Sequence, residues 1–151
     1  MNTYLLDTNV WLRTVQRESP QHSLAVEALA TLLTQGDAVC ITAQNVIEFW
    51  SVATRPTAAN GLGWSVEVVR QEIDRLQTQF PILGETTEVF GHWVSLVTAS
   101  RVIGRRVHDA RLAVMLAHGI THLLTFNHDD FRQFPITVVT PGDLLASSKQ
   151  P

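Results

Sequence analysis

Five short apolar runs, separated by longer stretches with helical periodicity, constrain the fold of this sequence more than any other feature. Each run is short enough for a buried strand, and the five are Tyr4–Leu6, Ala38–Thr42, Pro81–Leu83, His122–Thr125 and Thr137–Val139. Strands that alternate with helices favour a parallel sheet with helices on both faces. We therefore predict an α/β fold with a central, mostly parallel sheet of about five strands flanked by helices.

The stretches between the runs carry apolar residues at helical spacing. They predict helices over about 9–17, 23–34, 43–53, 65–79, 87–100 and 110–118. Ser65 is expected to cap the helix that it opens. The 151 residues contain no internal repeat and no obvious linker, so we expect a single domain over residues 1–146 and a frayed tail over 147–151.

Composition excludes several classes of protein. A sequence that is 45% hydrophobic and 17% charged is typical of a compact globular protein and not of a disordered one. No apolar run is long enough to span a bilayer, and the first residues lack the positive charge of a signal peptide. The single cysteine, Cys40, cannot form an internal disulfide and is expected in the core. We expect a cytoplasmic protein with no membrane partner.

Acidic residues recur where the chain is expected to return to one edge of the sheet. Asp7 directly follows the first run, and the carboxyl ends of parallel strands form the crevice in which α/β proteins bind ligands. Glu48 lies in an apolar helical pattern, where a carboxylate needs a partner such as an arginine, a helix N-terminus or a metal ion. Further acidic or amide groups stand at the start of the last predicted helix and after the fourth run: Asp109, Asn127, Asp129 and Asp130.

These groups offer oxygen ligands, which Mg²⁺ and Mn²⁺ prefer. Such an ion can activate a water molecule and neutralise charge on a phosphodiester. Each residue also has a purely structural interpretation. Glu48 can pair with Arg55, Asp109 can cap its helix, and the turn from Asn127 to Asp130 can be a solvated one. The sequence therefore predicts a Mg²⁺ or Mn²⁺ site and leaves these alternatives open.

The basic residues are distributed unevenly. Ten of the eleven are arginines, and Arg101, Arg105 and Arg106 stand close together just before Asp109. Guanidinium groups match phosphate oxygens, whereas the net charge of −3 does not by itself indicate a nucleic-acid-binding protein. The cluster is either an RNA-binding rim beside the acidic residues or a solvated helix end with ordinary ion pairs.

Together these motifs resemble those of PIN-domain ribonucleases, above all the VapC-like toxins of bacterial and archaeal toxin–antitoxin pairs. The resemblance covers nearly the whole chain and depends on Asp7-Thr8-Asn9, Glu48, His108-Asp109-Ala110 and Thr125-Phe126-Asn127 with Asp130-Phe131. It implies a Rossmann-like sheet and a Mg²⁺- or Mn²⁺-dependent site that cleaves RNA by a metal-activated water. It also implies a cognate antitoxin as partner and a homodimer.

Carried over residue by residue, the resemblance implies a role for each matching position. The metal ion is expected on three acids: Asp7, Glu48 and Asp109. Thr8 and Asn9 are expected to orient the first carboxylate or a bound water, and Thr125 supports them. Many relatives have Asp where this chain has Asn127, so the fourth catalytic position is expected to involve Asn127 and Asp130.

Other functions remain open. One is a PIN-like module that binds RNA or protein without catalysis. Another is a phosphoryl-transfer hydrolase of the haloacid-dehalogenase type, but such an enzyme needs a second Asp where Asn9 stands and a lysine, and the only lysine is Lys149. Within the ribonuclease interpretation, His108 offers metal-free acid–base cleavage through the RNA 2′-hydroxyl. No serine, cysteine or lysine is placed beside a base as covalent catalysis requires.

Overall fold

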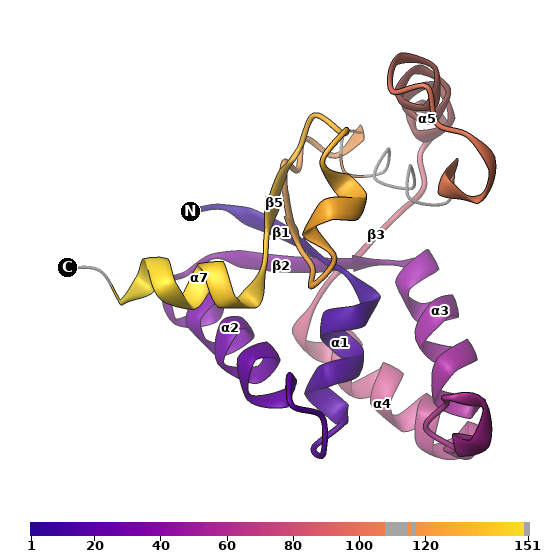
Figure 1. The fold of residues 1–151 in the computed structure, drawn as a ribbon, viewed down its shortest axis with the longest axis vertical. Coiled ribbons are helices and arrows are strands. Elements are labelled where there is room, and N and C mark those ends of the chain that lie inside the picture. Colours follow the sequence, from indigo (N-terminus) through magenta and orange to yellow (C-terminus); the bar gives the residue numbers. More distant parts are fainter. Residues whose placement is uncertain (108–114, 116, 150–151) are drawn as a thin grey trace.

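The computed structural model describes residues 1–107, 115 and 117–149, which form a central sheet with helices packed against it (Figure 1). The strands are β1 (Thr3–Leu6), β2 (Ala38–Thr42), β3 (Ile82–Leu83), β4 (His122–Leu124) and β5 (Thr137–Val139). All pair in parallel, in the order β3-β2-β1-β4-β5. The predicted fold class and all five predicted strands are confirmed.

The helices also follow the predicted pattern. They are α1 (Thr8–Val15), α2 (His22–Thr34), α3 (Ala43–Thr54), α4 (Val66–Gln79), α5 (Thr87–Ala99) and α7 (Pro141–Ser148), with short 3₁₀ turns η1 (Thr57–Ala59) and η3 (His128–Phe131). The Ser65 hydroxyl accepts a hydrogen bond from the Val68 backbone N–H, which confirms the predicted cap. Most of the helix expected over 110–118 lies outside the described residues. No helix in the described part of the chain has the length and apolar character needed to cross a membrane.

Among the described residues, α7 is an α-helix that the sequence analysis missed. Its N-cap is Thr140, whose hydroxyl accepts from the Asp143 backbone N–H, and proline occupies its first turn. This combination is a standard helix start, because proline has no N–H to satisfy there. The helix continues through Ser148, so the first two residues of the expected C-terminal tail are helical.

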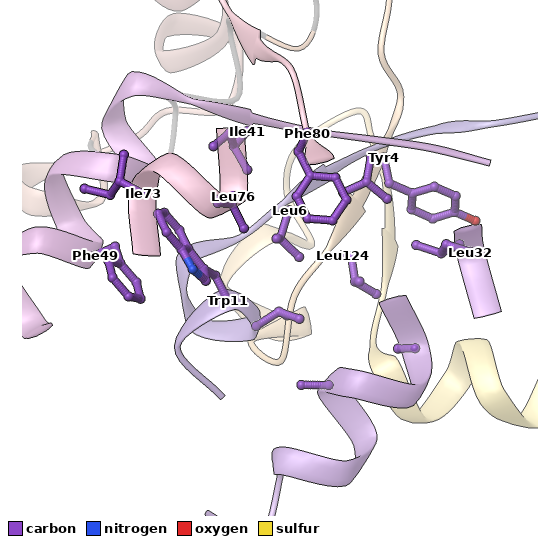
Figure 2. Packing of buried hydrophobic residues seen from close by; sticks show 14 of the residues in the cluster. Tyr4, Leu6, Trp11, Leu32, Ile41, Phe49, Ile73, Leu76, Phe80 and Leu124 are labelled. Carbon is purple, nitrogen blue, oxygen red and sulfur yellow. The ribbon is translucent and has the colours of Figure 1, made fainter. Parts of the chain in front are cut away.

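The strands alternate their side chains between two apolar cores, as the pleat of a sheet requires. On one face, Leu6 and Leu124 join a large core under α1–α4 and α7, part of which Figure 2 shows. On the other face, Leu5, Cys40 and Leu123 join a smaller core that includes Leu96 of α5. Because both faces are covered, consecutive residues of a strand are apolar, as Tyr4, Leu5 and Leu6 of β1 show.

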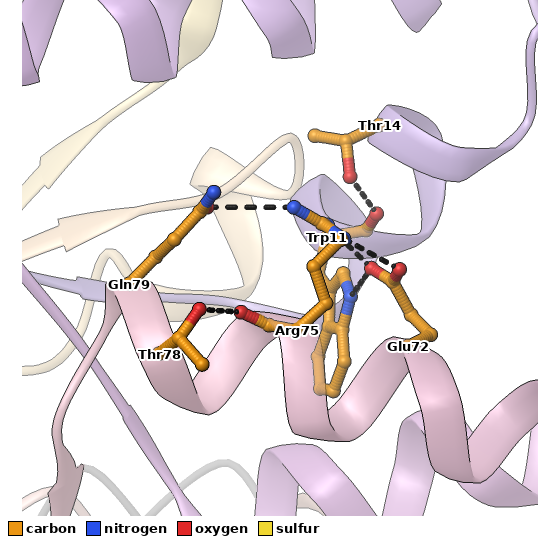
Figure 3. Close-up of polar contacts among 6 residues, drawn as sticks. All are labelled: Trp11, Thr14, Glu72, Arg75, Thr78 and Gln79. Carbon is orange, nitrogen blue, oxygen red and sulfur yellow. Dashed lines mark hydrogen bonds and ion pairs between the residues drawn. The ribbon is translucent and has the colours of Figure 1, made fainter.

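A polar network ties α1 to α4 at the border of the larger core (Figure 3). The indole N–H of Trp11 donates to Glu72 at 3.1 Å, and Arg75 donates to both carboxylate oxygens of Glu72 at 2.8 and 2.6 Å. Trp11 is 1% exposed, so this bond satisfies a donor that burial would otherwise leave unpaired.

The sheet order places β1 at the centre, between β2 and β4. The polar residues that end or follow these three strands therefore meet at one edge. They are Asp7 after β1, Thr42 at the end of β2, and Thr125 after β4. All three are buried.

Candidate active site

Asp7 is held between the end of β1 and the start of α1. Its backbone N–H donates to the Leu124 carbonyl at 2.9 Å, and its own carbonyl accepts the first hydrogen bonds of α1. Its side-chain oxygen Oδ2 accepts from the Thr125 hydroxyl at 2.8 Å. At 7% exposure, the carboxylate is buried and fixed before any ligand binds.

Thr125 lies beneath Asp7 and organises the contact between β1 and β4. Its hydroxyl oxygen accepts from the Asn9 side-chain amide at 3.1 Å and from the Asn127 backbone N–H at 3.0 Å. The Asn9 amide oxygen accepts from the Phe126 backbone N–H at 3.2 Å. Asn9 and Thr125 thus act together on one carboxylate, the one on Asp7.

Glu48 projects from α3, which the Thr42 N-cap places directly after β2. Its oxygen Oε2 accepts from the Thr8 hydroxyl at 2.9 Å, and Oε1 accepts from the Gln44 side-chain amide at 3.2 Å. Thr8, which was expected to orient the first carboxylate or a water, therefore hydrogen-bonds to the second acid. Its hydroxyl in turn accepts from the Asn45 amide at 3.0 Å.

A pocket of about 340 Å³ opens over these groups. It brings together six of the residues that the sequence analysis selected, namely Asp7, Thr8, Asn9, Glu48, Asn127 and Asp130. Asp129 is not among the residues that line this pocket, and it pairs with Arg132 at 2.7 Å. Between the two neighbouring aspartates, the geometry thus favours Asp130 as the one that faces a ligand.

The predicted arginine rim is placed only in part. Arg106 donates to the Asp130 backbone carbonyl at 3.0 Å, which brings its guanidinium to the border of the pocket. Arg101 and Arg105 are exposed. Arg101 has a positive φ of 50°, a conformation that non-glycine residues rarely adopt.

Arg55 is an additional cation in the lining of the pocket. It follows α3, where the Gly63 backbone N–H donates to its carbonyl at 2.9 Å. Gly61 packs so closely against the Arg55 backbone that any Cβ would overlap it. A glycine is therefore required to hold the chain against Arg55.

The oxygen-rich lining fits a hard cation in its chemistry. Within residues 1–107, 115 and 117–149, however, no cluster of three His, Cys, Asp or Glu side chains is close enough to hold a metal ion. Asp109, the third expected ligand, lies outside the described residues, as does the neighbouring His108. Asp7 and Glu48 thus supply two of the three carboxylates that the resemblance implies.

Two polar residues of α3 were missed. Asn45 is 2% exposed and hydrogen-bonds to both Thr42 and Thr8, and Gln44 hydrogen-bonds to Glu48. The signal for Asn45 was the Thr42-x-x-Asn45 spacing, which matches a capping box with Asn in place of Glu or Gln.

Comparison with known proteins gives a consistent result. The PIN domain family model matches residues 4–136. Significant structural matches include VapBC2 from Rickettsia felis bound to a promoter DNA fragment, with a TM-score of 0.66 and 16% identity over 91% of this chain and 98% of that chain. A toxin–antitoxin complex from Klebsiella pneumoniae has a TM-score of 0.64 and 22% identity over 91% and 97% of the two chains.

VapC20 from Mycobacterium tuberculosis, described as a sarcin–ricin loop cleaving toxin, also matches. It has a TM-score of 0.61 and 20% identity over 84% of this chain and 92% of that chain. No curated protein sequence matches significantly. The structural matches, at these identities, show a shared fold, and the family model spans most of the sequence. The chain belongs to the PIN domain family.

Proposed function

We propose that the protein is a Mg²⁺- or Mn²⁺-dependent endoribonuclease and the toxin of a toxin–antitoxin pair. The observation that carries the proposal is the pair of carboxylates on Asp7 and Glu48, which come from different elements and face one pocket. A threonine hydroxyl donates to each of them. Membership of the PIN family and the fold shared with VapC20 support the same function.

In this proposal the metal ion is held by Asp7, Glu48 and Asp109. When bound, the ion supplies Lewis acidity and a water of lowered pKa, which suits hydrolysis of a phosphodiester. The protein's own contribution is preorganisation, because Thr125 and Thr8 hold the two described acids in place before the ion arrives. Asn127 and Asp130 line the same pocket, and their proposed role is to orient the scissile phosphate and the attacking water.

RNA is the proposed substrate, and the arginines beside the pocket are its proposed phosphate contacts. Arg106 lies at Asp130, and Arg101 and Arg105 precede it on the same segment. Phosphate contacts of this kind position a nucleic acid without reading its sequence. The choice of cleavage site would therefore depend on the shape of the pocket and on how RNA loops enter it.

A homodimer is part of the proposal, with α5 as its interface. Phe90 is 71% exposed and Ile103 is 81% exposed, and Val94 is exposed on the same helix as Phe90. Phe90 and Val94 are four residues apart and so lie on one face of α5, where exposed apolar side chains favour a protein interface. The resemblance implied the dimer without an interface; among the described residues the large exposed aromatic side chain is Phe90, whereas Trp11 is in the core.

An antitoxin is the second proposed partner. A hollow of about 530 Å³ lies between α1, α2 and α4, and its lining includes Trp11, Thr14 and Glu72, which are drawn in Figure 3. Apolar side chains such as Leu29 and Val26 line it, and Arg17 adds positive charge, whereas the charge of Arg75 is paired with Glu72. Such a hollow suits an apolar peptide segment that carries acidic residues. The similar solved structures include complexes of toxins with antitoxins, which supports this partner.

The test is cleavage of RNA oligonucleotides by the purified protein with Mg²⁺ or Mn²⁺ and with excess EDTA. Metal-dependent hydrolysis should leave 5′-phosphate and 3′-hydroxyl ends and should stop in EDTA. Replacing Asp7 with Asn should abolish cleavage and weaken Mn²⁺ binding measured by calorimetry. Asp129→Asn is the matched control, because Asp129 pairs with Arg132 and is not a lining residue.

Two results would contradict the proposal. Cleavage that persists in EDTA and leaves 2′,3′-cyclic phosphate would assign the chemistry to acid–base catalysis by His108. RNA binding without cleavage under any metal would favour the non-catalytic binding module.

A further inference from the structure

We propose that Asn45 is a positioning residue that acts through Thr8 to hold the carboxylate of Glu48. Only one part of this inference rests on the proposed function, namely that the Glu48 carboxylate binds a metal ion. The hydrogen bonds themselves join four described residues in one continuous chain: Thr42, Asn45, Thr8 and Glu48.

The orientation of the Asn45 amide is fixed by its neighbour. The Thr42 backbone N–H, which can only donate, lies 2.8 Å from Asn45 Oδ1, and the Thr42 hydroxyl lies 2.9 Å from the same oxygen. The oxygen end of the amide must therefore face Thr42. It follows that the other end, the Nδ2 amino group, faces Thr8 at 3.0 Å.

The direction of the Thr8 hydroxyl follows from that of Asn45. An amide nitrogen can only donate, so the Thr8 oxygen accepts from Asn45 and keeps its single proton for another partner. The Thr8 hydroxyl donates this proton in a hydrogen bond to Glu48 Oε2, which lies 2.9 Å from the Thr8 oxygen. Thr8 is 4% exposed and Asn45 is 2% exposed, so the chain of donors is buried. Hydrogen bonds of this kind are stronger in a low-dielectric interior than in water.

The carboxylate of Asp7 is held by the same kind of hydrogen-bond chain. Because the pattern occurs at both acids, chance is a poor explanation for it. The Phe126 backbone N–H fixes the Asn9 amide, Asn9 donates to Thr125, and Thr125 donates to Asp7. Each carboxylate thus accepts a hydrogen bond from a threonine hydroxyl. An asparagine amide orients that hydroxyl, and a backbone N–H orients the asparagine amide in turn. Asn45 is the counterpart of Asn9 for Glu48.

The decisive variant is Asn45→Asp, because it separates positioning from helix capping. The new carboxylate still accepts from Thr42, so the start of α3 keeps its cap. It cannot donate to Thr8, and it attracts the Thr8 proton away from Glu48. We expect Mn²⁺ affinity, measured by calorimetry, to fall roughly 10- to 100-fold, as is typical when a residue behind a metal ligand is lost.

The added charge needs its own control. Asn45→Leu is nearly isosteric and uncharged, loses the same donor, and should also weaken Mn²⁺ binding. It also loses the half of the capping box in which the Asn45 side chain accepts from the Thr42 backbone N–H, so Ser65→Ala, which removes the cap of α4, is the matched control for stability. Ser65→Ala should cost about 1 kcal/mol of stability and leave Mn²⁺ affinity unchanged.

A double-mutant cycle with Thr8→Val tests the route of the effect. If Asn45 acts through Thr8, Asn45→Asp should add little to the loss of affinity that Thr8→Val already causes. A fully additive loss would show that the new charge acts directly on the metal and would overturn the proposal. Unchanged Mn²⁺ affinity in both Asn45 variants would overturn it as well.

An NMR measurement separates this proposal from the proposed function. The side-chain amide protons of Asn45 should shift in Thr8→Val and, through Thr8, in Glu48→Gln, with no metal present. Unmoved amide signals would refute the hydrogen-bond chain whether or not the protein binds Mn²⁺. Shifted signals in a protein that binds Mn²⁺ but never cleaves RNA would uphold the positioning role and refute the ribonuclease.

Discussion

Helices α3 and α5 have similar compositions and opposite environments. Both contain many apolar residues, yet α3 buries Asn45, Phe49 and Ala53, whereas Leu96 is the only fully buried residue of α5. The cause lies in the strand before each helix. Helix α3 follows β2, which lies inside the sheet, and α5 follows β3, a two-residue strand at its edge. The position of a helix on the sheet, more than its composition, decides whether it builds a site or presents a surface.

The inner face of α3 is held to the core by aromatic contacts. Phe49 stacks on Trp11 with ring centroids 3.9 Å apart and meets Trp64 edge-on at 6.1 Å. On α5, by contrast, Phe90 stacks on Trp93 at 6.4 Å while most of its surface faces solvent. Glu48 is therefore carried on a rigid element, and the exposed aromatic surface is carried on a less enclosed one.

The largest expected difference between α3 and α5 is in the free energy of unfolding lost when one phenylalanine on each helix is truncated. Phe49→Ala should destabilise the protein by about 3–5 kcal/mol, because it removes a fully buried ring. Phe90→Ala should change the stability of the monomer by less than about 0.5 kcal/mol. Urea unfolding of both variants at low protein concentration measures the difference. Equal losses would show that α5 is as deeply packed as α3.

The second prediction uses Cys40 to report whether α5 stays docked. Burial raises the pKa of the Cys40 thiol from its ordinary value of 9.0 to about 11, so its thiolate should be roughly 100-fold scarcer than that of a free cysteine at pH 8. Alkylation by iodoacetamide should be slow by a similar factor. Leu96→Ala should accelerate it, since Cys40 and Leu96 share the smaller core. Fast alkylation of the unmodified protein would mean that this core opens readily.

The same raised pKa fixes the sign of a stability change at high pH. The unfolded chain releases the thiol proton first, so the folded state binds more protons between pH 9 and pH 11. The contribution of Cys40 to stability should therefore be complete below pH 9 and should be lost as the pH approaches about 11. Cys40→Ala should remove this part of the alkaline decline.

The third prediction concerns the exposed face of α5. Phe90→Glu should raise the dissociation constant of the proposed homodimer about 10- to 100-fold, because it places a charge at an aromatic anchor. Val66→Glu, at another exposed apolar position on α4, is the control and should have no effect. Light scattering across a concentration series gives the mass. A monomeric wild-type protein at micromolar concentration would remove the dimer from the proposal.

The smallest effect is expected when the arginines of the segment that follows α5 are replaced and RNA binding is measured. Replacing Arg101, Arg105 and Arg106 together should weaken RNA binding about equally for all RNA sequences. It should also reduce the slope of log affinity against log salt concentration by about 2, because each phosphate contact contributes about 0.7 to that slope. Arg70→Ala is a control, because Arg70 forms an exposed pair with Asp74 on α4. The same slope in the triple variant and the wild type would identify the three arginines as ordinary surface residues.

The sequence predicted where the site residues lie in the fold better than it predicted their hydrogen-bond partners. Periodicity and strand ends located Asp7, Glu48 and the turn at Asn127, because these depend on local patterns. The partner of Thr8 could not be predicted in this way, since Thr8 and Glu48 are 40 residues apart and meet only when β1 and β2 pair. Helix α7 was missed for a different reason. Its start at Thr140-Pro141 carries a local signal, a capping threonine before a proline, which the sequence analysis did not use.

The central position of β1 also sets when the pocket can form during synthesis. Asp7 and Thr125 are 118 residues apart in the chain and become neighbours only when β4 joins β1. At about 5–20 residues per second, the ribosome adds Thr125 roughly 6 to 24 s after Asp7. Until then, the first carboxylate exists in the nascent chain without the hydroxyl that holds it. Translation order thus delays assembly of the acidic pocket until Thr125 has been synthesised.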